Sequence, residues 1–372
     1  MSEYQRYEFI ALDRPLTPKQ MAELRSISTR AEISPTRFWN EYQWGDLKAD
    51  PAKLLARYFD AHLYFANWGT HRLMLRLPRA RVDVKVLKGY FIGRHAARLT
   101  LAGEHVVLDF ISQDEEPEDD EERQGSLAAL TPLRAELLRG DLRSAYLAWL
   151  LAVQAGEVGD DAPEPPVPAG LAMLTAAQQA MVEFLRIDVD LLAAAARDSV
   201  KPDEGDDAFR RWVTRLPPAR KDQWLLRAAD APDLALGGEL LRTFRAEKGP
   251  GAASARRTVR ELQALAETQQ GMREKAEAAR AKKARDAAGR RLQRKLDELG
   301  RDVDAAWVKL EKLVEASTYD EAVMLAVDLK ELATRGDEFQ DFAMRFEAMR
   351  KRQHRRRGFF DRWKYQGDIA RW

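Results

Sequence analysis

The sequence of 372 residues contains no cysteine. This absence excludes disulfide bonds, thiolate metal ligands and cysteine nucleophiles, and it is typical of proteins from a reducing compartment. The longest apolar run, residues 145–153, is far shorter than the ~20 residues that span a bilayer. Met1 is followed by polar residues instead of a basic and apolar leader. The sequence therefore predicts a cytoplasmic protein without a membrane partner.

Signature motifs of the common enzyme classes are also missing. The sequence has no Walker loop, no dinucleotide-binding glycine fingerprint, no His-Glu-x-x-His helix and no Gly-x-Ser-x-Gly elbow. Four of the 5 histidines fall in or beside predicted strands, without a second ligand at helical spacing: His62, His71, His95 and His105. We therefore predict no metal, no cofactor and no catalytic residue. An enzyme that uses Glu41, Tyr42 or His62 stays open as an alternative.

Charge is almost balanced over the whole chain, with 61 Lys and Arg against 60 Asp and Glu, but it is unevenly distributed. Residues 251–300 and 350–372 are net basic and flank a net acidic segment, 301–349. In the run 114–122, every residue except Pro117 is acidic. Self-repulsion favours an open loop there. A site for a divalent cation or a basic partner is the alternative, although the run lacks the ligand spacing of a calcium loop.

Residues 1–112 combine strand patterns with helix starts. Alternation of apolar and polar residues predicts strands at 7–11, 38–44, 62–67, 71–77, 97–101 and 106–110. Helices are predicted after Thr17 and Asp50, because each of these capping residues precedes a proline. The valines at 82, 84 and 86 alternate like a further strand. These patterns predict an α+β module with a mostly antiparallel sheet and helices.

The rest of the chain is predicted to be helical and to end in a long helix or coiled-coil bundle. We expect the following domains: an α+β domain 1–158, made of the sheet module 1–112, an acidic loop 113–123 and a helical pair 125–157; a proline-rich acidic linker 159–170; a small helical domain 171–250; a long helix with an antiparallel helical bundle 251–349; and a basic-aromatic tail 350–372. The proline-rich composition of the linker predicts a stiff, extended segment.

A heptad pattern marks the long helical segment. Apolar residues spaced alternately by four and three define a helix seam, namely Leu292, Leu296, Leu299, Val303, Ala306, Leu310 and Leu313. The seam is either the internal core of a helical bundle or the contact of a dimerising coiled coil. A break at Gly271, Gly289 or Gly300 would fold residues 252–315 into a hairpin instead of one helix. The sequence leaves these alternatives open.

Two groups of residues are candidates for contact with a partner. Phosphate or an acidic partner is predicted to bind the basic residues Arg350, Lys351, Arg352, Arg355, Arg356 and Arg357, which aromatic residues follow. A ligand or peptide is predicted to contact Trp39, Asn40, Glu41, Tyr42, Asn67 and Trp68. Core packing is the competing explanation for the second group, and a solvated surface is the competing explanation for the first.

Two aromatic segments, 38–45 and 58–70, resemble a family of bacterial proteins of unknown function, and the resemblance covers most of residues 1–160. Residues 319–350 are similar to helical endings of assorted bacterial proteins. Neither resemblance implies an activity, a cofactor or site residues. The first implies a bacterial cytoplasmic source.

These patterns together predict a non-enzymatic interaction or assembly protein. The α+β module would recognise a protein or peptide partner, and the helical or coiled-coil arm would mediate self-association. The first alternative is a nucleic-acid-associated factor that binds phosphates through the basic tail, with the nearby aromatic residues stacking on exposed bases. The second alternative is an enzyme of unknown class on the first module.

Overall fold

The computed structural model describes residues 3–114, 125–200, 205–230, 236–248 and 256–367. Nearly all of the predicted acidic loop and the last tail residues therefore lie outside the described residues. The chain divides into two compact units, Met1–Met272 and Arg273–Trp372. Each unit contains a hydrophobic core of its own.

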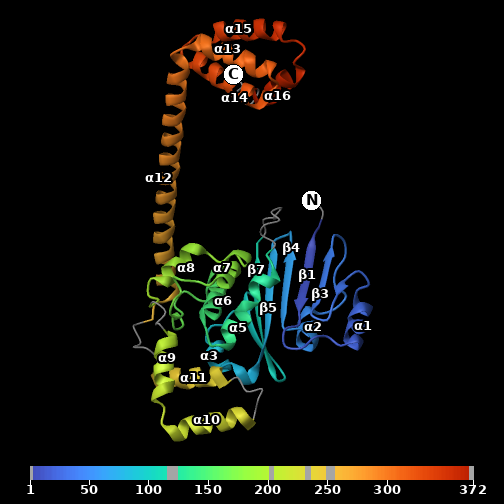
Figure 1. Ribbon diagram of the computed structural model, residues 1–372. Helices are drawn as coiled ribbons and strands as arrows, with labels where there is room; N and C mark the ends of the chain where they lie inside the picture. Colours follow the sequence, from blue (N-terminus) through green and yellow to red (C-terminus); the bar gives the residue numbers. More distant parts are fainter. Residues whose placement is uncertain (1–2, 115–124, 201–204, 231–235, 249–255, 368–372) are drawn as a thin grey trace. The chain divides into compact units, whose positions relative to one another are not determined.

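A seven-stranded sheet forms the centre of the first unit (Figure 1). All of its neighbouring strands are antiparallel, which confirms the predicted α+β class with an antiparallel sheet. The strands are β1 (Gln5–Ile10), β2 (Glu32–Ile33), β3 (Arg37–Tyr42), β4 (Ala61–Ala66), β5 (Thr70–Pro78), β6 (Ala97–Ala102) and β7 (His105–Gln113), in the order β2-β3-β1-β4-β5-β7-β6. Gly69 and Gly103 have positive φ at the two predicted hairpin turns.

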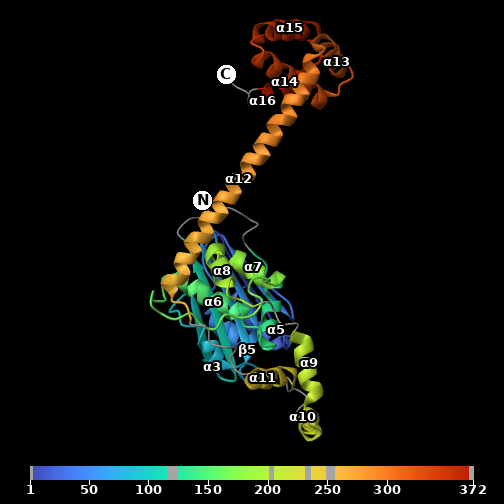
Figure 2. The ribbon, with the colours of Figure 1, turned by 90° about the vertical axis from the view of Figure 1, so that its left-hand side faces the viewer.

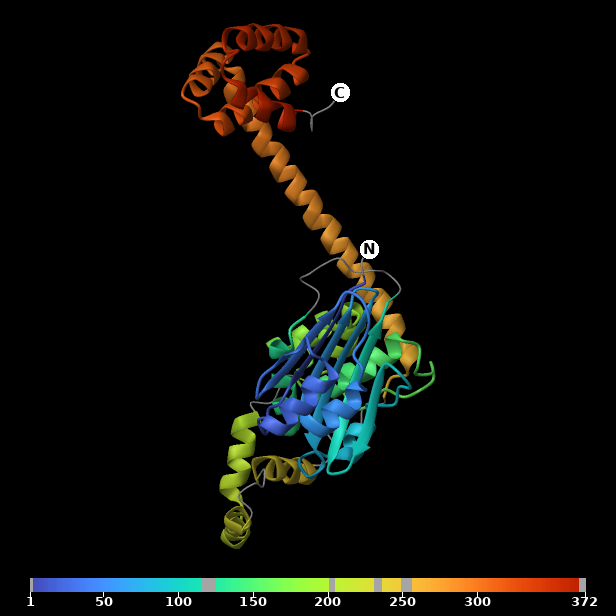
Figure 3. The same ribbon diagram turned by 90° about the vertical axis from the view of Figure 1, so that its right-hand side faces the viewer.

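The two faces of the sheet pack on different cores because side chains alternate along each strand. Leu63, Leu75 and Leu108 belong to the larger core, so we call their side the large-core face. Phe9 and Phe38 belong to a smaller core on the opposite side, the small-core face. Helices α1 (Pro18–Ile27) and α2 (Pro51–Tyr58) cover part of that face (Figure 3). Their N-caps are Thr17 and Asp50, as predicted.

One predicted strand is wrong. The segment 82–86 contains the start of α3 (Val84–Lys88) because the side chain of Asp83 accepts hydrogen bonds from the N–H groups of Lys85 and Val86, at 3.0 and 3.1 Å. An N-cap of this kind starts a helix whatever the alternation of the valines. The other helices of the first unit are η1 (Arg79–Arg81), α4 (Leu127–Leu130), α5 (Pro132–Leu138), α6 (Arg143–Gln154), α7 (Ala176–Phe184), α8 (Val189–Ala196), α9 (Gly205–Arg215), α10 (Pro218–Asp230) and α11 (Leu236–Lys248).

The larger core continues past the proline-rich segment 159–170. Met181 of α7, Leu191 of α8 and Leu262 of the following long helix all belong to the same core as the sheet. Within the segment, Pro163 pairs with Thr258 in an isolated antiparallel bridge. The predicted linker therefore crosses the first unit instead of separating two cores, and residues 171–196 do not have a core apart from that of the sheet.

The second unit is a helical bundle. The long helix α12 (Val259–Gly300) begins in the first unit and is followed by α13 (Val303–Glu315), α14 (Tyr319–Arg335), α15 (Phe339–Arg352) and α16 (Arg357–Gly367). The chain leaves the helix after Gly300, and the Asp302 side chain caps α13 by accepting the Ala305 N–H at 2.8 Å. Residues 259–315 thus form two helices with a break at one of the predicted glycines.

The predicted seam is interrupted by this break. Leu310 is fully buried, and Leu299, Val303 and Leu313 pack around it in the core of the bundle. Leu296 is also buried, whereas Leu292 is half-buried. These leucines therefore contribute to an intramolecular core, which is one of the two alternatives that the heptad pattern leaves open.

Replacing Leu310 by alanine tests this core. Leu310 has no exposed surface, so we expect Leu310→Ala to lower the free energy of unfolding of the second unit by about 2–5 kcal/mol. Val308 on the same helix is 54% exposed, and Val308→Ala should change the stability by less than about 0.5 kcal/mol. Hydrogen exchange of α13 and α14 peptides, recorded as a function of urea concentration, measures the stability change of each variant. Equal effects of the two variants would contradict the buried position of Leu310.

Candidate functional site

The predicted contact residues of β3 are divided between the two faces of the sheet. Trp39 and Glu41 lie on the large-core face, where the guanidinium of Arg37 lies 5.8 Å from the Trp39 ring centroid and the Tyr4 hydroxyl donates to Glu41 at 3.2 Å. Asn40 lies on the other face, is only 3% exposed, and donates from Nδ2 to Ser28 Oγ at 2.8 Å. This strand therefore does not place its four predicted contact residues on one surface.

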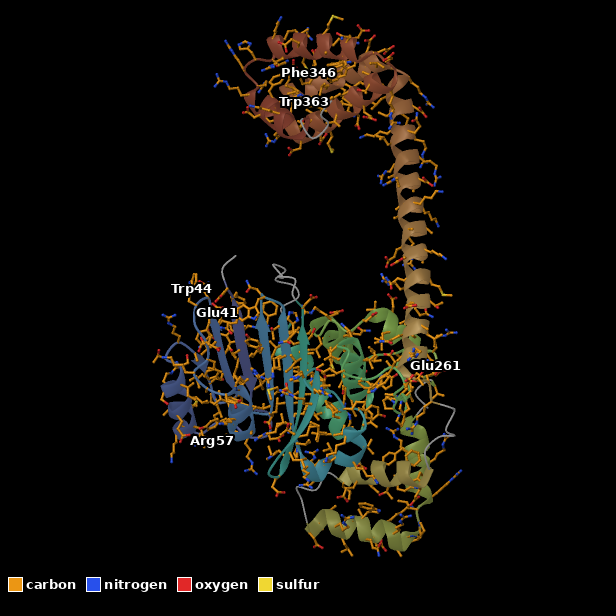
Figure 4. The ribbon with its side chains drawn as sticks, turned by 180° about the vertical axis from the view of Figure 1, so that it is seen from behind. Glu41, Trp44, Arg57, Glu261, Phe346 and Trp363 are labelled. Carbon is orange, nitrogen blue, oxygen red and sulfur yellow. The ribbon has the colours of Figure 1, made fainter. Side chains whose placement is uncertain are left out.

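The turn between β4 and β5 holds the other two predicted residues. Asn67 Oδ1 accepts the Tyr4 N–H at 2.9 Å, and the Asn67 N–H donates to the Tyr4 carbonyl at 3.0 Å, so Asn67 fixes the start of β1. Trp68 is 41% exposed. Trp44, which follows β3, is 77% exposed and lies at an end of the sheet near Glu41 (Figure 4).

Both exposed tryptophans lie at the same end of the sheet. Strands β3 and β4 are each antiparallel to the intervening β1, so β3 and β4 run in the same direction. Trp44 and Trp68 follow the last residues of these strands. The sequence predicted Trp68 as a contact residue, but it did not single out Trp44 as one.

Hydrogen bonds on the small-core face anchor the loop that carries Trp44. The Tyr7 hydroxyl donates to Asp46 Oδ1 at 2.6 Å, and Gln5 Nε2 donates to the Gly45 carbonyl at 2.6 Å. Gln5 Oε1 in turn accepts the Tyr64 hydroxyl at 2.9 Å. The loop after β3 is therefore fixed by buried residues of β1, and Trp44 is held on a rigid support.

Two arginines share one carboxylate beside these tyrosines. Arg72 donates from Nε and Nη2 to both oxygens of Asp109, at 2.8 and 2.9 Å, and Arg98 Nη2 contacts Asp109 Oδ2 at 2.5 Å. The Asp109 side chain is 6% exposed, whereas those of Arg72 and Arg98 are 21% and 41% exposed. This group carries two positive charges against one negative charge, and Arg98 is the more exposed of the two cations.

We call the following residues the sheet-end surface: Tyr42, Trp44 and Trp68 at this end of the sheet, Tyr64 and Arg72 two residues in from it, and Arg98 four residues in on the edge strand β6. Tyr42 and Tyr64 are half-buried. Their aromatic rings lie beside Tyr7, with centroid distances of 5.9 and 4.7 Å. The surface thus combines exposed and half-exposed aromatic rings with two guanidinium groups.

The titratable groups near this surface hold their charge state at neutral pH. Burial, more than any other cause, raises the pKa of Tyr64 to about 12. For Arg72, burial lowers the pKa, but the hydrogen bond and charge of Asp109 outweigh it, and the net shift is upward. His62 is fully buried against the Phe9 ring, and burial lowers its pKa to about 3. These groups suit the binding of a ligand better than proton transfer.

The candidate enzyme residues are not brought together. Glu41 and Tyr42 are adjacent on β3 and point to opposite faces, and His62 Nδ1 lies 3.0 Å from the Glu8 carbonyl inside the sheet. Within the described residues, no group of three or more His, Asp and Glu side chains has the geometry to hold a metal ion. No helix in that part of the chain is long and apolar enough to cross a membrane.

The predicted basic tail is a turn between two helices. Arg350, Lys351 and Arg352 end α15, and Arg357 begins α16. Arg352 forms an ion pair with Glu311 of α13. Further contacts join Arg350 to Glu347 at 3.8 Å and Arg356 to Ser317 Oγ at 3.3 Å. The two ion pairs reduce the charge that this turn offers to phosphate, whereas the hydroxyl of Ser317 leaves the charge of Arg356 in place, and Lys351 and Arg355 are exposed.

The aromatic residues after this turn belong to the bundle core. Phe359 is fully buried, and the rings of Phe346 and Trp363 lie 4.8 Å apart between centroids (Figure 4). Phe360 packs against the same core. The expectation that these rings stack on exposed bases is therefore wrong for Phe359, because its ring has no exposed surface. Trp372 lies outside the described residues.

Comparisons of the chain with family models, with curated proteins and with solved structures give no match.

Proposed function

We propose that this chain is a non-enzymatic interaction protein that binds an acidic segment of a partner protein on the sheet-end surface. The proposal rests on exposed Trp44 and Trp68 at one end of the sheet, together with Arg72 and Arg98 on the small-core face, two and four residues in from that end. Trp, Tyr and Arg are the residues that most often dominate the binding energy of protein interfaces.

The two guanidinium groups favour a carboxylate in the partner. Arg98 uses one nitrogen in its contact with Asp109, so its other N–H groups can donate to a carboxylate of the partner. The partner's apolar side chains would then pack against the tryptophan rings. Because the loop after β3 is already anchored, little conformational entropy is lost when Trp44 is covered.

Self-association through the helical arm stays a prediction. The seam residues of α13 are already packed inside the bundle, so a dimer contact through this helix would use its outer surface. Light scattering after size exclusion, at low and high protein concentration, measures the oligomeric state directly.

Photo-crosslinking tests the proposed surface. We expect a photoreactive benzoylphenylalanine at position 44 or 68 to form the same discrete adduct with one cellular protein, because both side chains lie at the same end of the sheet. The same residue at position 173 is the control, since Met173 is 63% exposed in the same unit but lies before α7. The adducts are identified by mass spectrometry.

A second pair of variants makes this test specific. Arg98→Ala should abolish the adduct, while Asp109 keeps its two bonds from Arg72. Arg37→Ala is the matched control, because the Arg37 side chain is 44% exposed and pairs with Glu8 on the large-core face. An adduct that survives Arg98→Ala, or that forms equally well from position 173, would contradict the proposal.

A further inference from the structure

The middle of α12 is exposed on all sides. Residues 272–291 are exposed without exception, yet α12 is one uninterrupted helix (Figure 2). The stretch consists mainly of Ala, Arg, Lys and Glu, which have high intrinsic helix propensity. This part of the helix therefore presents side chains that its own core does not use.

Basic residues on this stretch gather on one side of the helix. At about 100° per residue, one sector of about 100° contains the positions of Arg280, Lys283, Arg290, Arg291 and Arg294. We call these residues the basic stripe. Asp286, the acidic residue between them in sequence, falls outside the sector. Other cations of the stretch, such as Lys282 and Arg285, project from the opposite side of the helix.

The charge of the basic stripe is not compensated within the described residues. Arg273 falls in the same sector but precedes the stripe by two turns, and Lys295 lies just outside the sector; they form ion pairs with Glu277 and Asp328, respectively. By contrast, no carboxylate of the described residues lies within ion-pair distance of a basic-stripe residue. Among the described residues, the side chains of the basic stripe donate one hydrogen bond, from Arg294 Nε to the Arg290 carbonyl at 3.3 Å. All of the basic-stripe residues are exposed.

The chemistry around the stripe indicates the class of partner. Membrane-surface helices need a face of large apolar residues, but the positions between these cations hold alanine, such as Ala284 and Ala287. The centres of protein interfaces are depleted in charged residues. Interfaces with nucleic acid are polar and strongly positive. Proteins that bind single strands add aromatic stacking, and the stripe has no aromatic residue.

We propose that the basic stripe of α12 binds the phosphate backbone of double-stranded nucleic acid without sequence preference. Arg280 and Arg294 are separated by about 21 Å along the helix at ~1.5 Å per residue. This length matches about six base pairs at ~3.4 Å each. Because the helix holds these cations in fixed positions, they can contact the phosphates of a duplex, which are also held in fixed positions. The basic stripe belongs to the second unit and the sheet-end surface to the first, and this proposal does not depend on the function proposed for that surface.

Salt dependence of binding to a mixed-sequence 20-base-pair DNA duplex tests the proposal. A plot of log affinity against log salt concentration has a negative slope, and each neutralised phosphate makes this slope steeper by about 0.9. Contact through all five cations of the stripe should therefore give a slope of about −4.5. The triple variant Arg280→Gln, Lys283→Gln, Arg291→Gln should reduce the slope by about 2.7 and weaken binding more than tenfold at low salt. Fluorescence anisotropy with the full chain measures both quantities.

Two further triple variants provide controls with the same change in charge. The substitutions Lys275→Gln, Lys282→Gln and Arg285→Gln remove cations from outside the stripe, and Lys351→Gln, Arg355→Gln and Arg357→Gln remove them from the turn between α15 and α16. Each should reduce the slope by less than about 1. Circular dichroism verifies that all variants keep their helix content.

The proposal is overturned if the unaltered chain does not bind the duplex at low salt. It is also overturned if either control variant loses as much affinity as the stripe variant, or if the chain prefers single-stranded DNA or anionic phospholipid vesicles. None of these outcomes depends on the crosslinking partner of the sheet-end surface, so the two proposals fail or succeed separately.

Discussion

Replacement of Arg257 by alanine is expected to destabilise the first unit by about 3–5 kcal/mol, because it leaves a buried carboxylate without its charged partner. Arg257 donates from Nε and Nη2 to both oxygens of Glu164, at 2.8 and 2.9 Å, and from Nη1 to the Ala194 carbonyl at 3.0 Å. Glu164 is 3% exposed and also accepts the hydroxyl of Tyr146. The contacts of Arg257 thus join the start of α12 to α8 and the proline-rich segment.

The neighbouring Arg260 provides the control for this result. Its side chain is 65% exposed and pairs with Asp160 and Asp161 at 3.6 and 3.2 Å, so Arg260→Ala should lower the free energy of unfolding by less than about 1 kcal/mol. Adding Glu164→Gln to Arg257→Ala should recover part of the loss, since the buried group is then neutral. Native-state hydrogen exchange of α6 peptides in urea reports the stability of the first unit. Equal effects of Arg257→Ala and Arg260→Ala would refute the expectation.

Asp60→Asn should lower the free energy of unfolding of the first unit by a similar amount, about 3–5 kcal/mol at neutral pH. Asp60 is 1% exposed and its Oδ2 accepts the N–H groups of Leu12 and Asp13, at 2.7 and 2.9 Å. Its Oδ1 accepts Arg76 Nη2 at 2.8 Å and lies 3.6 Å from Arg134 Nη2. The amide would leave both buried guanidinium groups without this carboxylate.

The effect of Asp60→Asn should decrease in acid. Burial raises the pKa of Asp60, but the hydrogen bonds from the Asp13 N–H and from Arg76 outweigh burial, so that its pKa lies below the ordinary value of an aspartate side chain. The ionised group therefore stabilises the fold above the pKa of the unfolded chain, and this contribution is lost as the pH falls through the lower folded pKa. The difference between the two proteins should narrow from pH 5 to pH 3. Asp161→Asn, at an 89% exposed side chain, is the control, and a difference that does not vary with pH would contradict the assignment.

Local patterns in the sequence predicted much of the fold. The N-caps Thr17 and Asp50, the turn glycines Gly69 and Gly103, and the alternation of the strands act over a few residues, and the structure contains each of them. The strand predicted from the valines of 82–86 is wrong because alternation over five residues fits a strand as well as a capped short helix. Here the side chain of Asp83 decided the outcome.

The candidate site could be predicted only in part. Trp68 was recognisable as an aromatic residue at a turn, but its exposure and that of Trp44 depend on which helices cover the sheet. The pairs of Asp109 with Arg72 and Arg98 join residues 37 and 11 positions apart, and they follow from the register of β5, β6 and β7. A strand pattern without its register does not determine which charged residues become neighbours.

The sequence by itself determined the alternation of the main sheet strands, the starts of α1 and α2, and the uneven distribution of charge, because these properties depend on residues close together in the chain. Only the tertiary structure decided that the proline-rich segment crosses the first unit, that Glu164 pairs with Arg257 across 93 positions, and that the leucines of α13 are buried in their own bundle. Contacts of this kind follow from the packing of distant segments, which the composition and periodicity of a single segment do not specify.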